Sequence, residues 1–182
     1  MSIEEYSGIL VYLEGEKDAL SKSSLGLLGK AKYLAETLGV SVDGIILTQR
    51  AEGLTREAIA FGANKIYIKE KADFDVKETL DILYNLINEK KPEAVLFSNS
   101  LESQRLAPRL AQRFEVELGC NCTGLEIDTE RRTLLMTYPI YDGKMLKEVG
   151  STTKRPQIAT VAEGVFVEPG KDDLREGEVV KL

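Results

Sequence analysis

Polar side chains follow two apolar runs of the sequence, at the points where buried strands would end. The run at residues 8–13 is followed by a carboxylate, and the run at residues 94–97 is followed by small hydrogen-bonding side chains. Small polar residues ahead of a helix can bind a phosphate through their backbone N–H groups, helped by the helix dipole. The carboxylate could accept a hydrogen bond from a ribose hydroxyl. The sequence therefore contains a candidate site for a nucleotide such as AMP or ATP. Its residues are Glu14, Ser98, Asn99, Ser100 and Ser103.

The same segments carry features that oppose a phosphate site. The loop that contains Glu14 also contains Glu16 and Asp18, whose negative charges would repel a phosphate. The segment 98–103 contains no glycine, so it does not match a glycine-rich phosphate loop. The sequence favours a polar loop with internally satisfied hydrogen bonds, next to a capped helix.

The segment Gly26-Leu27-Leu28-Gly29-Lys30 is similar to a phosphate loop but has the wrong spacing. Two residues separate its glycines where that loop has four, and Ala31 follows the lysine instead of serine or threonine. Because the glycines fall within a helical pattern, we attribute them to close packing of a helix on the sheet.

Cys120 and Cys122 could in principle bind a metal or act in redox chemistry. Zinc needs four ligands, and the sequence has neither a second cysteine pair nor any histidine. We therefore expect two ordinary half-buried thiols and no metal site.

The segment 138–144 places two tyrosines beside a tight turn. A β-hairpin with packed aromatic side chains is one interpretation, and an exposed interaction surface is the other. The candidate interface residues are Tyr138, Tyr141, Gly143 and Lys144.

Composition excludes several classes of function. The 182 residues include 30 acidic and 24 basic side chains, a net charge of −6, which disfavours binding to nucleic acid. The absence of histidine removes Ser-His and Cys-His nucleophile pairs and histidine general bases, so we expect no enzyme. No apolar run approaches the roughly 20 residues of a membrane span, so we expect a cytoplasmic protein without membrane insertion.

Strand and helix patterns alternate through the first two thirds of the sequence. Short apolar runs predict strands at 8–13, 42–47, 65–68 and 94–97. Apolar residues at helical spacing predict helices at 24–38, 54–61 and 75–89, and a fourth helix marked by Leu106, Leu110 and Phe114. This alternation predicts an α/β fold, a doubly wound and mostly parallel sheet with strand order of the 3-2-1-4-5 type.

The last third has a different pattern. Strand-like segments at 125–127, 134–138, 145–149 and 158–161 follow one another without a helix, so we interpret them as an antiparallel β extension. We place one α/β domain at residues 1–166 and a polar tail, a linker or docking arm, at residues 167–182.

Seven segments spread from residue 9 to residue 161 together carry a family resemblance. They are Ile9-Leu10-Val11-Tyr12-Leu13-Glu14, Ser24-Leu25-Gly26-Leu27-Leu28-Gly29-Lys30-Ala31, Gly62-Ala63-Asn64-Lys65-Ile66, Lys91-Pro92-Glu93-Ala94-Val95-Leu96-Phe97, Leu106-Ala107-Pro108-Arg109-Leu110-Ala111, Pro139-Ile140-Tyr141-Asp142-Gly143 and Arg155-Pro156-Gln157-Ile158-Ala159-Thr160-Val161. In this order they resemble the N-terminal domain of the electron transfer flavoprotein alpha subunit. The arginine-proline-glutamine strand near the end favours the alpha over the beta subunit.

The resemblance implies a fold related to adenine nucleotide alpha hydrolases and universal stress proteins. It also implies that FAD is held mainly by a C-terminal domain that would begin about where this sequence stops, and that the AMP of the family belongs to the beta subunit. The sequence departs from the family at Ser103-Gln104-Arg105, Asn121, Lys144 and 160–164.

Two functions remain open at this stage. The first is an electron transfer flavoprotein alpha-like scaffold that docks a beta-type subunit and a flavin domain without catalysis of its own. The alternative is a homodimeric stress-protein-like module that binds AMP or ATP. The missing glycine-rich phosphate loop favours the scaffold. An acid/base enzyme is a weaker third hypothesis, because no carboxylate pair has a defined placement.

Overall fold

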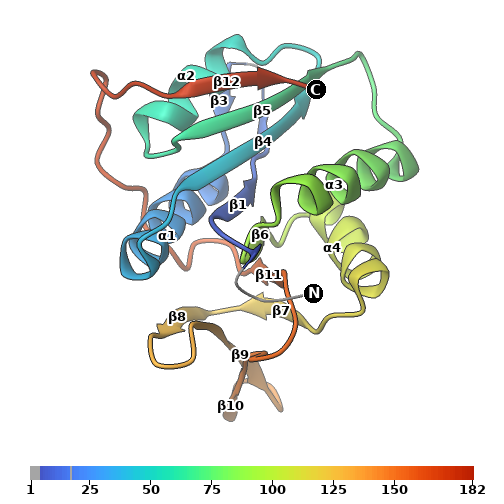
Figure 1. The fold of residues 1–182 in the computed structure, drawn as a ribbon, viewed down its shortest axis with the longest axis vertical. Coiled ribbons are helices and arrows are strands. Elements are labelled where there is room, and N and C mark those ends of the chain that lie inside the picture. The colour runs from blue at the N-terminus through green and yellow to red at the C-terminus, as the bar shows by residue number, and fades with distance from the viewer. Residues whose placement is uncertain (1–4, 17) are drawn as a thin grey trace.

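A parallel sheet of seven strands runs through the centre of the protein (Figure 1). The computed structural model describes residues 5–16 and 18–182. In spatial order the strands are β12 (Glu178–Lys181), β5 (Lys65–Glu70), β4 (Val42–Thr48), β1 (Ile9–Tyr12), β6 (Ala94–Ser98), β11 (Gln157–Val161) and β7 (Leu118–Cys122). The predicted order of the first four strands is confirmed, and the order reverses between β1 and β6. The α/β fold class is confirmed as well.

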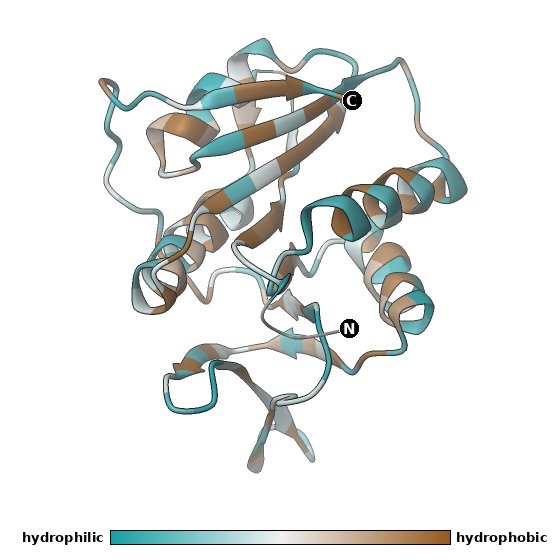
Figure 2. Ribbon diagram, in the orientation of Figure 1, coloured by the Kyte–Doolittle hydropathy of each residue, from teal (hydrophilic) through white to brown (hydrophobic). Residues whose placement is uncertain are grey.

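Two pairs of helices bury the two faces of this sheet. Helices α1 (Lys22–Leu38) and α2 (Glu52–Ala60) share one hydrophobic cluster with the sheet, and α3 (Val76–Lys90) and α4 (Leu101–Phe114) share the other. Ser21, Asp75 and Ser100 cap the N-termini of α1, α3 and α4 with their side chains. Because both faces are covered, β1 and most of β6 consist of buried apolar residues, and the centre of the sheet is mainly brown in Figure 2.

A separate antiparallel sheet of three strands lies beyond β7. It contains β8 (Gly124–Asp128), β9 (Thr133–Ile140) and β10 (Met145–Val149) in the order β10-β9-β8. Leu125, Leu134 and Met136 bury one side of β8 and β9 in the α1 cluster, whereas β10 is almost wholly exposed. A short hairpin of β2 (Gly15–Glu16) and β3 (Ala19–Leu20) precedes α1.

The segment predicted as an antiparallel strand at 158–161 lies instead in the parallel sheet, as β11. It pairs with β6 on one side and β7 on the other. All five residues of β11 are buried, because α4 covers one face and the α1 cluster covers the other. The strand β7 was not predicted, since its sequence Leu-Gly-Cys-Asn-Cys contains no β-branched or aromatic residue.

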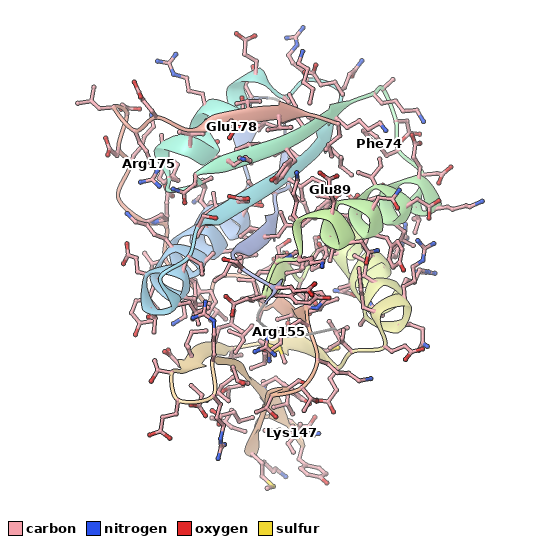
Figure 3. The ribbon with its side chains drawn as sticks, in the orientation of Figure 1. Phe74, Glu89, Lys147, Arg155, Arg175 and Glu178 are labelled. Atoms are coloured by element: carbon pink, nitrogen blue, oxygen red, sulfur yellow. The ribbon has the colours of Figure 1, made fainter. Side chains whose placement is uncertain are left out.

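Side chains around β11 join the two sheets. The Gln157 amide oxygen accepts a bond from the Leu134 backbone N–H at 2.8 Å, and its amide nitrogen donates to the Leu134 carbonyl at 2.9 Å. Nearby, the Arg132 guanidinium makes two bonds to the buried carboxylate of Glu93, at 2.7 and 3.0 Å. Arg155 lies at the same junction, where it donates to the Arg132 carbonyl at 2.5 Å (Figure 3).

The C-terminal segment packs back on the domain. Its backbone bonds to Ala60, the Arg175 side chain donates to the Gly62 carbonyl at 3.1 Å, and Glu178–Lys181 pairs with β5 as the edge strand β12 (Figure 3). The sequence predicted a polar linker or docking arm there. Most of its side chains are exposed. Its position is set by the backbone pairing of β12 with β5, which composition does not reveal. None of the helices in the described part of the chain has both the length and the apolar composition of a membrane span.

The two glycines of α1 face this C-terminal segment and not the sheet, which corrects the packing partner expected from the sequence. A Cβ atom at position 26 would lie 2.4 Å from the carbonyl oxygen of Phe166, and one at position 29 would lie 3.0 Å from Pro169. Because Gly26 and Gly29 have no side chains, the segment around Phe166 and Pro169 can cross α1 closely.

Replacing Gly26 with alanine is expected to displace the segment around Phe166. We expect a loss of about 1–3 kcal/mol in the free energy of unfolding, measured by urea denaturation, together with faster proteolysis between residues 163 and 177. Gly170→Ala is the matched control, because a Cβ there meets no atom within 4 Å. Equal stability and equal proteolysis of the two variants would contradict this packing.

Candidate functional site

Four of the five candidate nucleotide-binding residues meet at the carboxyl ends of β1 and β6. Ser98, Ser100 and Ser103 all donate hydroxyl bonds to the carboxylate of Glu14, at 2.6 Å for Ser100 and 3.3 Å for Ser103. The fifth residue, Asn99, points elsewhere and donates to the Asn121 side chain at 2.9 Å. These four side chains therefore meet where the strand order reverses, and the serine hydroxyl groups bond to the chain's own carboxylate.

Two helix N-termini hold Glu14 in this position. The Ser24 hydroxyl, in the first turn of α1, accepts from the Glu14 backbone N–H at 2.9 Å and donates to the Glu14 carbonyl at 3.0 Å. On the other side, the Ser100 hydroxyl caps α4 by accepting from the Ser103 N–H at 3.0 Å. The carboxylate thus lies against the N-terminal turn of α4, where the helix dipole stabilises negative charge.

This arrangement places an internal anion at the position where the sequence offered a candidate phosphate site. Ser98 and Ser103 are buried, and their hydroxyl bonds go to Glu14. A phosphate would have to displace the carboxylate, or bind beside it against electrostatic repulsion. The side chain of Glu16, which the sequence placed in the same loop, lies outside the described part of the chain.

Tyr12 is a buried polar residue of this region that sequence reasoning missed. Its phenol donates to the Glu102 carboxylate at 2.7 Å, on the α4 side of the sheet. Burial, followed by the charge of Glu102, raises the pKa of Tyr12 well above its ordinary value, so the phenol keeps its proton and acts as a donor. Its phenol, the one polar side chain within the apolar run at residues 8–13, was the available signal.

The two cysteines are not equivalent. Cys122 is buried and Cys120 is exposed. Burial, with a smaller effect of Cys120, raises the pKa of Cys122 to about 12, and burial also raises the pKa of Cys120. Both thiols are therefore protonated at neutral pH and are poor nucleophiles. Across residues 5–16 and 18–182, no three acidic, cysteine or histidine side chains form a group that could hold a metal ion.

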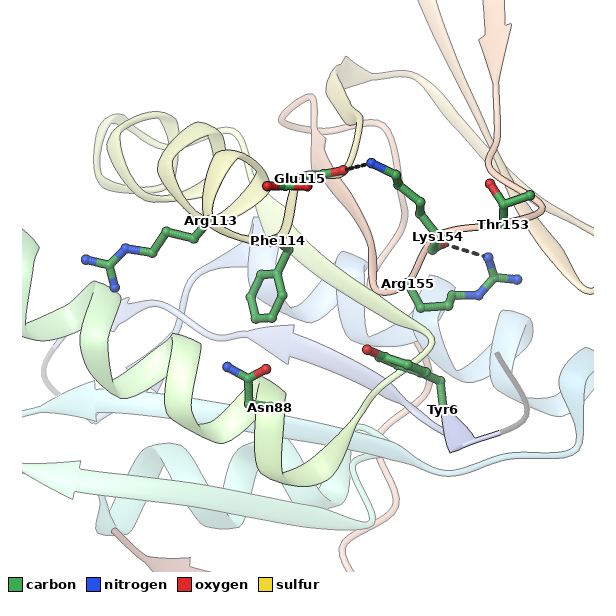
Figure 4. A pocket seen from close by; sticks show the side chains of 8 residues that line it. All are labelled: Tyr6, Asn88, Arg113, Phe114, Glu115, Thr153, Lys154 and Arg155. Atoms are coloured by element: carbon green, nitrogen blue, oxygen red, sulfur yellow. Dashed lines mark hydrogen bonds between the residues drawn. The ribbon is translucent and has the colours of Figure 1, made fainter. Parts of the chain in front are cut away.

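A pocket lies at the opposite end of the sheet, where α3 and α4 end (Figure 4). Asn88, Phe114 and Arg155 line it, from three segments far apart in the sequence. Two of its cationic groups bond to the backbone: Lys154 donates to the Glu115 carbonyl at 2.5 Å, and Arg155 donates to the Lys154 carbonyl at 2.9 Å. The third, Arg113, donates to the Asp81 carboxylate at 2.7 Å. These bonds close the ends of two loops and give no indication of a ligand.

The candidate interface residues lie on the β9–β10 hairpin. Tyr141 is 72% exposed, and Lys144 is exposed beside it, whereas Tyr138 is half-buried against the core. Tyr141, Asp142 and Gly143 are all left-handed, with φ of 51°, 55° and 80°. This turn presents Tyr141 and Lys144 to solvent, and Gly143 adopts its conformation without the penalty that a side chain would bring.

The fold and the crevice define a class: a doubly wound α/β domain whose switch-point crevice is bonded internally, with a small antiparallel sheet attached. The family model described as "Electron transfer flavoprotein domain" matches residues 9–182. The chain therefore belongs to the electron transfer flavoprotein family, and its relatives show it to be an alpha-subunit-like domain.

Several curated relatives cover nearly all of the chain. It is 35% identical over 169 residues to the electron transfer flavoprotein subunit alpha of Clostridium acetobutylicum, covering 91% of this chain and 50% of the relative. It is 32% identical over 183 residues to that of Thermoanaerobacterium thermosaccharolyticum, covering 99% and 55%. It is 27% identical over 177 residues to a lactate dehydrogenase (NAD(+),ferredoxin) subunit LctC of Acetobacterium woodii, covering 96% and 42%. The chain thus spans about half the length of these relatives.

Proposed function

We propose that this chain is a scaffold domain of an electron transfer flavoprotein assembly in the cytoplasm. It docks a beta-type subunit and a flavin domain, and it makes or breaks no bonds itself. The observation that carries this proposal is the carboxylate of Glu14, which accepts three serine hydroxyl bonds in the crevice where a related fold would hold a nucleotide. The domain keeps the nucleotide-binding fold as a support and uses its surface for assembly.

The family supports the rest of the proposal. Relatives named as alpha subunits match this chain over about half of their own length. We therefore assign the binding of FAD to parts of the assembly outside these 182 residues. For the beta-type subunit we assign the hairpin turn with Tyr141, Gly143 and Lys144, together with Tyr138, because it is exposed and projects from the domain (Figure 1).

One observation favours a second function, a homodimeric module that binds AMP or ATP. Three serine hydroxyls and the N-terminus of α4 converge at the switch point, as an adenine-nucleotide site would require. The scaffold is the better supported function, because the carboxylate already occupies this convergence point.

Native mass spectrometry of the chain tests both functions. With AMP, ATP or FAD at low micromolar concentration we expect no mass increment, and with an electron transfer flavoprotein beta-type subunit we expect a one-to-one complex. Tyr141→Ala is expected to weaken that complex about tenfold or more. Tyr33→Ala, a tyrosine 53% exposed on α1, is the matched control. An AMP or ATP adduct that Glu14→Ala abolishes would instead establish the nucleotide-binding module.

A further inference from the structure

The strand β10 is an exposed edge with apolar side chains on both of its faces. It is the outermost strand of the antiparallel sheet and lies at the end of the molecule (Figure 1). Met145 is 56% exposed and Leu146 is 67% exposed, on opposite faces of the strand. Figure 3 shows where Lys147 of the same strand lies in the antiparallel sheet. Such an edge is a template for pairing with another strand.

The hydrogen-bonding direction of β10 follows from the backbone hydrogen bonds of its neighbour β9. The Thr137 carbonyl accepts from the Thr123 N–H at 2.8 Å, so the Thr137 backbone points toward β8 and away from β10. Thr137 stands opposite Glu148, and Pro139, which has no N–H, stands opposite Leu146. Because alternate residues of an antiparallel strand point to opposite edges, the backbone groups of Leu146 and Glu148 face outward.

When β10 is placed antiparallel beside β10 of a second copy, one register brings opposite charges together. Two copies related by a two-fold axis perpendicular to the sheet place residues of the same face opposite each other. A register centred on Lys147 would set two ammonium groups against each other. A register centred on Leu146 sets Leu146 against its own copy and places Lys144 opposite Glu148 of the second copy, twice. Met145 then lies beside Lys147 of the second copy.

We propose that β10 pairs antiparallel with β10 of a second copy of this chain, centred on Leu146. The two three-stranded sheets then form one six-stranded sheet across the two-fold axis. The Leu146 residues exchange two backbone hydrogen bonds, and each Glu148 N–H donates to the Lys144 carbonyl of the other copy. Two Lys144–Glu148 ion pairs flank this centre. The contact is small, so the dimer is weak and depends on concentration. This proposal does not rest on the proposed function. Because Lys144 belongs to both contacts, the second copy and the beta-type subunit compete for this hairpin, and the weak dimer gives way to the one-to-one complex.

Charge reversal at the two ends of the strand tests the register. Sedimentation velocity of the unmodified chain, over a series of concentrations, is expected to show a monomer–dimer equilibrium. K144E and E148K are each expected to weaken dimerisation about tenfold or more, because each one places like charges opposite each other twice. The double variant K144E/E148K is expected to restore it. An equimolar mixture of the two single variants is expected to form a heterodimer, because its ion pairs are again complementary.

Two further variants separate this contact from other surfaces. L146E is expected to abolish the dimer without affecting the fold, because Leu146 is exposed in the monomer. K77E, the same charge reversal at an exposed lysine on α3, is expected to leave the dimer unchanged. A chain that stays monomeric at every concentration overturns the proposal, and so does a dimer that K144E leaves intact. If the chain is monomeric and L146E abolishes its binding to a beta-type subunit, the β10 edge belongs to that partner. This result overturns self-pairing and leaves the scaffold function standing.

Discussion

Replacing Gln157 with leucine is expected to lower the free energy of unfolding by about 4 kcal/mol. The Gln157 side chain is buried and bonds both the N–H and the carbonyl of Leu134. These backbone groups lie on the β10 side of β9, but β10 pairs only as far as Met136, so no strand reaches them. Leucine has a similar volume and no polar atom, so it leaves two buried backbone groups without partners, at about 1–3 kcal/mol each.

Chemical denaturation of the variant and of Gln104→Leu measures this difference. Gln104 also bonds a backbone carbonyl, that of Asn99 at 3.0 Å, but it is exposed on α4. The control should therefore cost no more than about 0.5 kcal/mol. Amide hydrogen exchange should also accelerate at Leu134 in the Gln157 variant. If both variants lose the same small amount, the side-chain amide does not hold the two sheets together.

Replacing Glu14 with alanine is expected to lower the free energy of unfolding by about 3 kcal/mol. The hydroxyls of Ser98, Ser100 and Ser103 lose a common acceptor, and two of these serines are buried. Hydrogen bonds to a charged group contribute about 1.5–3 kcal/mol each, and water that enters the emptied crevice recovers part of the loss. The N-terminus of α4 also loses a nearby negative charge.

Thermal unfolding of Glu14→Ala, Glu14→Gln and Glu163→Ala tests this role. The glutamine variant is expected to fall between wild type and alanine, because its amide keeps one acceptor oxygen and loses the charge. Glu163 is an exposed carboxylate near the end of β11, and its removal should change stability by about 0.5 kcal/mol or less. An alanine variant at position 14 as stable as wild type would show that the carboxylate does not support the crevice.

The order of the central strands could be predicted because the relevant signals are local. Short apolar runs such as 94–97 alternate with helical spacing, and right-handed crossovers then leave few arrangements. The position of the crevice followed from that order, since the ends of β1 and β6 meet where the order reverses. Its residues could thus be named before any distance was known.

The contents of the crevice required three-dimensional contacts. The sequence placed Glu14 and Ser100 on facing loops but did not show that their side chains bond to each other. The structure shows this bond, with 2.6 Å between the Ser100 hydroxyl and the Glu14 carboxylate, as the polar loop interpretation requires. Asn99 was placed with them and in fact bonds Asn121, because a shift of one residue past a strand end redirects the side chain.

The last third of the chain was predicted less well, because its pairing is non-local. The hairpin at 138–144 was recognisable from its turn residues, but β11 resembles its antiparallel neighbours in sequence and pairs with β6, some 60 residues earlier. The C-terminal segment has the composition of a linker, and its edge pairing with β5 joins residues more than 110 positions apart. Neither pairing leaves a periodic signal in one segment.

The sequence by itself determined the α/β class, the strand order of the first half, the polar residues at the crevice and the resemblance to the electron transfer flavoprotein alpha subunit. These follow from apolar periodicity and from motifs that lie within single segments. Tertiary structure alone decided that Glu14 accepts three serine hydroxyl bonds, that Gln157 joins the two sheets and that β10 is left as an exposed edge. Each of these depends on which strands become neighbours, and hydrogen bonds between distant segments have no counterpart in local sequence.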